Sequence, residues 1–197
     1  MAIQNPIATS IGMSMEDFVR LYDQDGPFEL IDSERIALVP GVAEHTELIK
    51  LLYKLLLAYE QTDQRVSVYS EAPYVLVYTS DWVTGARIPA VMAYDAKRMA
   101  DYKTQTPNWK KMPHVLVPDM CIEFISPNDI YTEVDAKVER YLADGVRLVW
   151  VFNPRSSSVR VHNLNSIQSV RLTQEHTLDG GDVLPGFTLS VREVFPQ

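Results

Sequence analysis

Glu123 is a carboxylate within the most apolar stretch of the sequence, which runs from Val115 to Ile125. A buried, unpaired carboxylate is energetically costly, so such a group is neutralised, hydrogen-bonded, paired with a cationic side chain or bound to a metal ion. Two interpretations follow from the residue type alone. In one, Glu123 forms a structural ion pair with a lysine or arginine. In the other, it holds a cation at a site that performs chemistry.

Lys137 lies on a predicted helix from Tyr131 to Asp144, at the edge of an apolar stripe. A lysine at such an edge extends into solvent or reaches inward over the end of the sheet. An inward Lys137 approaches Glu123, because the helix packs on the strand that carries this glutamate. A carboxylate that holds a cation, beside a lysine that orients a water and stabilises developing negative charge, suits phosphodiester hydrolysis.

Asp119 and His45 are weaker candidates. Asp119 precedes Glu123 on the same face of the predicted strand, and at about 3.3 Å per residue the two carboxylates start roughly 13 Å apart. Asp119 therefore cannot readily chelate the same ion as Glu123. We expect it to support the strand start or to contribute to metal binding only indirectly, behind the direct ligands. His45 opens the buried stripe of a predicted helix, where a satisfied core histidine is the alternative. The sequence has no HExxH, CxxC, GxSxG or glycine-rich phosphate loop.

The composition is that of an acidic globular protein. Of 197 residues, 46% are hydrophobic and 22% are charged, with a net charge of −8. Because affinity for nucleic acid comes from neutralising phosphates, this charge excludes a broad basic surface and restricts any nucleic-acid contact to a local one. The single cysteine, Cys121, excludes an internal disulfide and favours a reducing, cytoplasmic setting. We find no signal-peptide pattern and no apolar stretch long enough to span a membrane.

The predicted elements indicate an α/β (α+β) mixed sheet with flanking helices. Residues 1–13 are expected to be loose and residues 14–197 to form a single domain. In the first half of the chain, the sequence predicts a helix starting at Ser14, a hairpin of strands 28–31 and 35–39, a helix over 42–60, strands 66–69 and 74–78, a turn over 79–86 and a strand over 87–94. In the second half it predicts a long loop over 95–114, alone or with one helical turn, a strand over 115–125, a helix over 131–144, a strand over 146–152 and two or three short final strands. Strand, helix and strand from 115 to 152 form a βαβ unit, so those two strands are predicted to be parallel.

The predicted loop contains a basic and aromatic segment, from Lys97 to His114. It carries five basic residues against one acid, with Tyr102 and Trp109 interleaved. A solvated loop is one interpretation, and a loop that grips a nucleic-acid strand is the other.

Several sequence blocks follow one another in a recognisable order from about residue 14 to the C-terminus. They are Phe28-Glu-Leu-Ile-Asp32, the helix opening at His45, Arg87-Ile-Pro-Ala90, Pro118-Asp-Met-Cys-Ile-Glu-Phe-Ile-Ser-Pro127, the stretch from Lys137 to Pro154, and Gly180-Gly-Asp-Val-Leu-Pro-Gly-Phe187. In this arrangement the chain resembles the Uma-type family of restriction-endonuclease-like proteins, a branch of the PD-(D/E)XK nuclease superfamily. The resemblance implies a restriction-endonuclease-like core, DNA as the substrate and a divalent ion, Mg or Mn. It implies that Glu123 binds the metal and acts with Lys137, that His45 and Glu29 lie near the site, and that a homodimer is common.

Ala90 departs from the family pattern, in which this position is an aspartate that binds the metal. Losing one of two carboxylate ligands weakens the hold on a hard dication. Asp95 is a poor substitute, because it lies roughly 16 Å further along an extended strand and on the opposite face. Three hypotheses remain: an endonuclease in which another acid compensates, a catalytically silent homologue that acts as a binding or assembly module, and an α/β protein in which Glu123 and Lys137 are only an ion pair.

Overall fold

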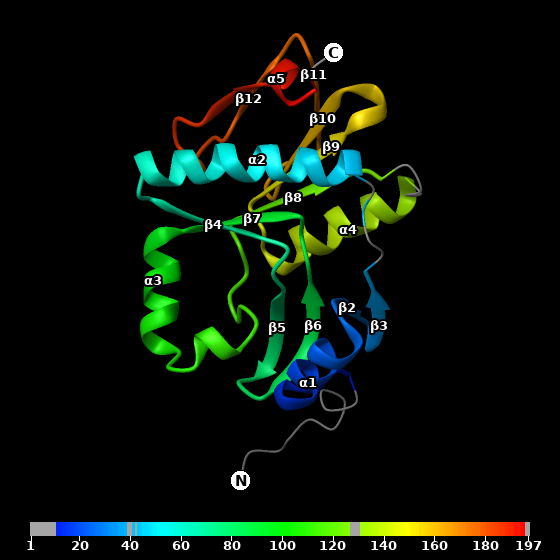
Figure 1. Cartoon of the computed structure of the whole chain (residues 1–197), viewed down its shortest axis with the longest axis vertical. Coiled ribbons are helices and arrows are strands. Elements are labelled where there is room, and N and C mark those ends of the chain that lie inside the picture. The colour runs from blue at the N-terminus through cyan, green and yellow to red at the C-terminus, as the bar shows by residue number, and fades with distance from the viewer. Residues whose placement is uncertain (1–10, 39–40, 42, 127–130, 196–197) are drawn as a thin grey trace. The chain divides into compact units, whose positions relative to one another are not determined.

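The computed structural model describes residues 11–38, 41, 43–126 and 131–195. The chain divides into two compact units. Unit 1 comprises Met1–Pro40, Ala72–Ile88 and Lys103–Val117, and unit 2 comprises Gly41–Glu71, Pro89–Tyr102 and Pro118–Gln197. Strands and helices occur together in both (Figure 1), so the predicted mixed α+β class is confirmed. The single domain expected over residues 14–197 stays a prediction.

Unit 1 is built on an antiparallel sheet in the order β1-β6-β2-β3, with β5 also paired to β6. Its elements are β1 (Met13–Ser14), α1 (Met15–Asp25), β2 (Phe28–Ile31), β3 (Glu34–Ala37), β5 (Tyr74–Thr79), β6 (Trp82–Arg87) and the 3-10 turn η1 (Trp109–Lys111). Ser14 caps α1 as predicted, since its hydroxyl accepts a hydrogen bond from the Asp17 amide at 3.0 Å. The predicted hairpin is confirmed, and its two turn residues, Asp32 and Ser33, have positive φ of 50° and 71°.

One prediction for unit 1 needs correction. The turn expected over residues 79–86 is wrong, because only Ser80 and Asp81 turn, whereas Thr79 ends β5 and the residues from Trp82 onward form β6. Polar residues and Gly85 hide the strand in the sequence, whereas pairing with β5 and β2 stabilises it in the fold. Residues 1–13 are expected to be loose, and residues 1–10 of this segment lie outside the described residues. Met13 is paired with Val83 in β1.

Unit 2 contains a six-stranded sheet in the order β11-β10-β9-β8-β7-β4. Its elements are α2 (Ala43–Thr62), β4 (Val66–Ser70), β7 (Val91–Asp95), α3 (Ala96–Gln105, which belongs to this unit up to Tyr102), β8 (Met120–Phe124), α4 (Tyr131–Asp144), β9 (Leu148–Asn153), the 3-10 turn η2 (Pro154–Ser156), β10 (Ser158–Asn163), β11 (Val170–Thr173), β12 (Thr177–Asp179), β13 (Thr188–Ser190) and α5 (Val191–Val194). β8 and β9 are parallel and joined by α4, which confirms the βαβ prediction, and the other neighbours are antiparallel. α2 and α4 lie on opposite sides of this sheet (Figure 1).

The long loop predicted over residues 95–114 is wrong, because its first half is the helix α3. Asp95 caps the N-terminus of this helix, because its side chain accepts a hydrogen bond from the Arg98 amide at 2.9 Å. Met99 and Tyr102 are buried three positions apart on one face of the helix. The abundance of polar residues obscures this short apolar face in the sequence. Among the described residues, no helix is both long and apolar enough to span a membrane.

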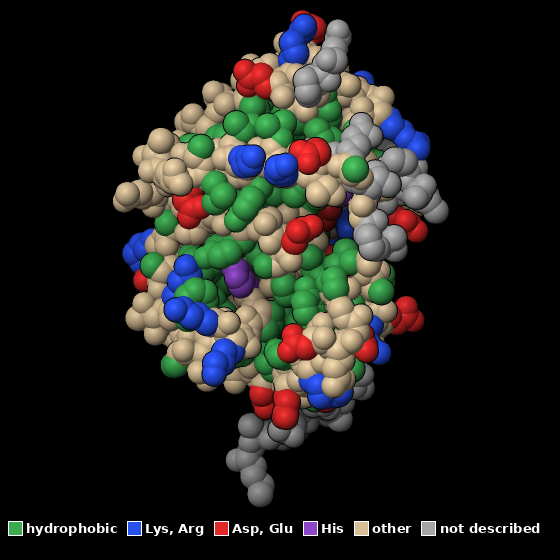
Figure 2. All heavy atoms as spheres, viewed as in Figure 1, with side chains coloured by type: hydrophobic (Ala, Val, Ile, Leu, Met, Phe, Trp, Pro, Cys, Tyr) green, Lys and Arg blue, Asp and Glu red, His purple; other side chains and the backbone are tan. Residues whose placement is uncertain are grey.

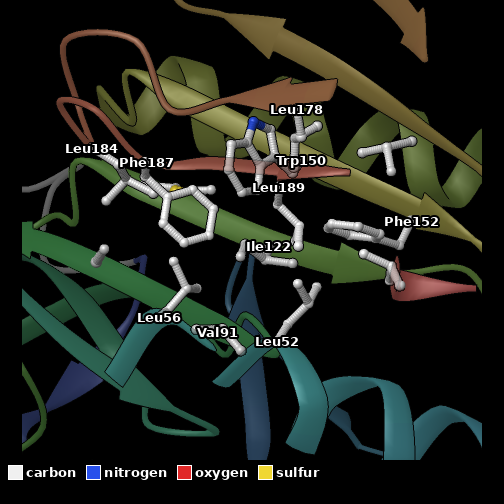
Figure 3. Packing of buried hydrophobic residues seen from close by; sticks show 14 of the residues in the cluster. Leu52, Leu56, Val91, Ile122, Trp150, Phe152, Leu178, Leu184, Phe187 and Leu189 are labelled. Carbon is white, nitrogen blue, oxygen red and sulfur yellow. The ribbon is translucent and has the colours of Figure 1, made fainter. Parts of the chain in front are cut away.

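The main core of unit 2 lies between the sheet and α2. Leu52 and Leu56 of α2 are fully buried against Val91 of β7 and Ile122 of β8 (Figure 3). Trp150 and Phe152 of β9 extend the same layer toward the C-terminal residues. Those residues, Leu178, Leu184, Phe187 and Leu189, complete the cluster (Figure 3). In β8, Ile122 and Phe124 belong to this core, so Glu123 between them points to the opposite face of the sheet.

Candidate active site on strand β8

Glu123 is buried on the face of β8 that α4 covers, with 8% of the residue exposed. Its Oε1 lies 3.7 Å from Nζ of Lys137, and the Tyr141 hydroxyl donates a hydrogen bond to the same oxygen. The carboxylate is therefore both charge-compensated and hydrogen-bonded, as a buried acid requires. The Lys137 side chain stays 31% exposed, so solvent reaches the ammonium end of this group of three side chains.

The periodicity of α4 explains why two of its side chains reach one carboxylate oxygen. Lys137 and Tyr141 are one helical turn apart, at i and i+4, and therefore lie side by side on one face. Val134 and Val138 are buried beside them and fix the helix on the sheet. The inward approach of Lys137 is one of the two outcomes that the sequence allows. Tyr141 is the residue that sequence reasoning missed, because its position in the apolar stripe concealed the role of its hydroxyl.

Ala90 lies one residue outside the pairing of β7 with β8. Val91 pairs with Ile122 at the end of this antiparallel register, and extending the register by one residue would bring Ala90 across from Glu123. Ala90 is half-buried, lies in a bend before β7 and contacts the core cluster. Its carbonyl accepts a hydrogen bond from the Glu71 amide at 3.3 Å. Paired positions in an antiparallel sheet have Cβ atoms about 5 Å apart, so an acid at this position lies close to the Glu123 carboxylate.

His45 lies on the α2 side of the sheet. Its ring packs edge-on against Phe124, with centroids 5.5 Å apart. Phe124 follows Glu123 in β8, so the two side chains leave the strand on opposite faces. The structure therefore brings His45 beside the strand that carries Glu123, but on the core face, which agrees with a histidine that packs in the core.

Asp119 is at the opposite end of β8 from Glu123, where it is buried with 4% exposed. Its Oδ2 accepts hydrogen bonds from the Asp95 amide at 2.8 Å and from Arg98 Nη1 at 2.6 Å. Its Oδ1 lies 3.6 Å from Arg147 Nη1. These contacts agree with the expectation that Asp119 supports the start of the strand. They occupy both oxygens of Asp119 with protein partners.

Glu29 belongs to unit 1 and is buried in β2, with 4% exposed. Its Oε1 accepts a hydrogen bond from the Ile88 amide at 3.1 Å. Arg87 beside it donates from Nη1 to the carbonyls of Leu30 at 2.7 Å and Ala86 at 3.1 Å. Within unit 1, these two residues satisfy backbone groups at the end of β6, which explains why both are charged and buried.

The described residues do not fit a resident divalent cation. Magnesium is held by near-octahedral oxygen ligands, usually with at least one or two carboxylates. Glu123 supplies a single carboxylate here, and it already contacts Lys137 and Tyr141. Across the part of the chain that the structure describes, no three His, Cys, Asp or Glu side chains gather where they could hold a metal ion.

The basic segment from Lys97 to His114, for which the sequence allows a solvated loop or a nucleic-acid grip, makes internal contacts. Lys97 pairs with Asp101 at 2.6 Å on α3. Lys103 and Lys110 lie over the Trp109 ring, with Nζ 4.8 Å and 5.7 Å from its centroid. On the face drawn in Figure 2, Lys and Arg side chains stand singly or in small groups among acidic ones. The acidic composition and this distribution both indicate that any contact with nucleic acid is local.

The comparisons with known proteins agree with the fold and the order of the elements. The model of the Uma2 family, described as "Putative restriction endonuclease", matches residues 15–192. The chain belongs to the Uma2 family. Among solved structures, it is similar to one from Anabaena variabilis, described as a putative nuclease belonging to DUF820, with a TM-score of 0.74. The identity is 14%, over 93% of this chain and 97% of that chain. No curated protein matches.

Membership of the Uma2 family and the structural match confirm the restriction-endonuclease-like fold. Because the identity is 14%, the solved structure supports a conclusion about the fold alone. The position one residue before Val91, where the resemblance implies an aspartate, is an alanine in this chain.

Proposed function

We propose that this Uma2 protein binds DNA and that its nuclease centre, formed by Glu123, Lys137 and Tyr141, has lost most or all of its phosphodiesterase activity. Family and fold support a nuclease ancestry. The observation that supports the loss is the register of β7 against β8, which ends at Val91 and Ile122 and, extended by one residue, would bring Ala90 opposite Glu123. A single carboxylate, neutralised by a lysine, cannot supply the charge that a catalytic dication needs.

What remains of the centre is suited to holding a phosphodiester without cutting it. Lys137 is partly exposed and carries a positive charge that can contact a phosphate oxygen. Glu123 pairs with that ammonium from the buried side, and Tyr141 in turn donates a hydrogen bond to Glu123. A cytoplasmic setting belongs to the same proposal, supported by the single cysteine, Cys121, which is buried and cannot form an internal disulfide. The homodimer stays a prediction.

The decisive experiment is a cleavage assay on supercoiled plasmid and single-stranded DNA with magnesium or manganese, paired with a binding assay on labelled DNA. We expect DNA binding by the wild type and no cutting above the level of Glu123→Gln. Glu139→Gln is the matched control, because Glu139 is an exposed acid on the same helix. Metal-dependent cutting that disappears in Glu123→Gln but persists in Glu139→Gln contradicts the proposed loss of activity.

A second candidate is an active metal-dependent endonuclease in which another acid replaces the missing aspartate. Glu71 is the acid that favours this alternative, since its amide is hydrogen-bonded to the Ala90 carbonyl. It follows β4 with a positive φ of 50° and is exposed, so its side chain can move. If Glu71 compensates, cutting is lost in Glu71→Gln as well as in Glu123→Gln, whereas DNA binding persists in both.

A further inference from the structure

A polar pocket lies beside the proposed centre, on the α4 side of the unit 2 sheet. Its wall combines residues of α4, β9, β10 and β11 with the turn η2. The polar members are Asp135, Asn153, Ser156, Ser158, Arg160, His162 and Arg171. Two arginines, a histidine and two hydroxyls in one pocket form a donor-rich surface. Such a surface matches the oxygens of an anion.

The two arginines are held next to each other by strand pairing. Arg160 of β10 lies directly opposite Arg171 of β11 in the antiparallel register. Like charges in directly opposed positions repel, so this arrangement lowers the stability of the sheet edge unless an anion lies between them. Among the described residues that line the pocket, Asp135 of α4 is the one acid beside the two arginines. Nε of Arg171 donates to Ser158 Oγ at 3.3 Å, which holds this guanidinium at β10.

His162 is an independent indication that the pocket accepts a ligand. Its Nε2 is buried and makes no hydrogen bond with any residue that the structure describes. Burial, with the nearby Arg160 charge, lowers the pKa of His162, while Asp135 opposes the shift. The ring is therefore neutral at neutral pH and carries one N–H donor and one acceptor nitrogen. A buried polar atom in a pocket wall calls for a partner, and a bound oxygen provides one.

The pocket and Glu123 share one row of the sheet. Glu123 pairs with Val151 of β9, Val151 pairs with Arg160, and Arg160 pairs with Arg171, so all four side chains point to the same face. Neighbouring strands are about 4.8 Å apart, which places Arg160 roughly 10 Å from Glu123 along the row. DNA advances about 3.4 Å per nucleotide. One strand can therefore contact both places within a few nucleotides.

We propose that this pocket binds a phosphate group of the DNA backbone, next to the phosphodiester held at Lys137. This assignment rests on the proposed function, because it takes DNA as the ligand. Arg160 and Arg171 supply the charge, and His162 and the serine hydroxyls supply additional hydrogen bonds. Phosphate contacts of this kind set the position of a duplex or strand without reading its sequence.

Two measurements on the full-length protein test the pocket. The first is the binding of a labelled DNA duplex, by fluorescence anisotropy in EDTA at several salt concentrations, to wild type, Arg171→Ala and the double variant Arg160→Ala/Arg171→Ala. We expect the double variant to bind roughly tenfold more weakly at low salt, with the salt slope reduced by about one per arginine. Arg192→Ala is the control, since Arg192 is an exposed arginine of the same unit, paired with Glu175. The second is a titration of wild type with inorganic phosphate, followed at the His162 ring by NMR.

The outcomes separate the pocket from the proposed function. A loss of DNA affinity confined to the pocket variants, with a His162 shift on adding phosphate, supports the assignment. Equal losses in Arg192→Ala and Arg171→Ala overturn it, because charge alone would then explain the effect. Phosphate that shifts His162 in a protein that binds no DNA refutes the DNA-backbone ligand and leaves a site for free phosphate. No shift and no selective loss refute the pocket as an anion site, even if the protein binds DNA. Thermal melts verify that each variant is folded.

Discussion

Replacing Ala90 with aspartate is the sharpest test of the structural interpretation. The register places this position across from Glu123, one residue before β7 begins. A carboxylate there lies about 5 Å from Glu123, measured between Cβ atoms. Two acids at that separation can bind one divalent ion between them, whereas Glu123 alone cannot. We therefore expect Ala90→Asp to bind magnesium, in contrast to the wild type.

The gain in magnesium affinity on Ala90→Asp can be calculated from the added carboxylate charge and its exposure to solvent. Two unit charges 4 Å apart interact by about 1 kcal/mol in water and by about 4 kcal/mol at an effective dielectric of 20, and a dication doubles both values. Ala90 is half-buried, so solvent screens the added charge and the lower limit of about 2 kcal/mol applies. That corresponds to an affinity for magnesium about thirtyfold higher than that of the wild type.

Thermal melts with and without magnesium measure this gain independently of catalysis. Without metal, the two opposed carboxylates should lower the melting temperature by up to about 4 °C, since like charges across a sheet cost up to about 1 kcal/mol. Magnesium at ten times the dissociation constant should add about 1.4 kcal/mol, or roughly 3 to 6 °C. Ala90→Asn is the matched control, with the same shape and no charge. A magnesium shift in Ala90→Asp no larger than in Ala90→Asn refutes the placement of this position opposite Glu123.

Three further substitutions test the buried polar groups. Asp119→Asn removes the charge that faces Arg98, so we expect about 1 kcal/mol less unfolding free energy in urea and unchanged DNA binding; weaker DNA binding would reveal a functional role. Tyr141→Phe removes a hydrogen bond to the buried Glu123 carboxylate and should cost about 1 to 3 kcal/mol in the same assay, so an unchanged midpoint would contradict that bond. Burial and nearby Lys103 lower the pKa of His114 to about 4. The unfolded state then binds the extra proton between pH 6.5 and 4, so stability should fall by about 3 kcal/mol as pH drops through this window. His114→Gln should lose less over the same pH range.

Elements with a strong periodic signal could be predicted from the sequence. The helix α4 agrees with its predicted bounds, and α2 begins and ends within two residues of them. The parallel pair β8 and β9 follows from a buried strand, a helix and a second buried strand in succession. The approach of Lys137 to Glu123 follows from the same helix pattern, because an inward lysine on α4 faces β8.

The features missed by the sequence analysis depend on long-range contacts. β6 lacks a clear alternating pattern, and its pairing with three other strands makes it a strand. The helix α3 is capped by Asp95. The backbone amide of Asp95 donates a hydrogen bond to the side chain of Asp119, a residue distant in the chain. Tyr141 could be placed on the buried face of α4 from the sequence. That its hydroxyl reaches Glu123 depends on how the helix packs on the sheet, which no local pattern specifies.

The alternation along β8 explains how a nuclease centre can decay while its fold persists. Ile122 and Phe124 point into the α2 core, which contributes much of the apolar burial of unit 2. Glu123 points the other way, and Ala90 contacts the edge of that core, so the alanine that the proposal places at a former aspartate position is compatible with core packing. Replacing an acid with alanine there even removes a repulsion between opposed carboxylates. Selection for stability therefore does not resist this substitution, and only selection for cleavage could preserve the aspartate.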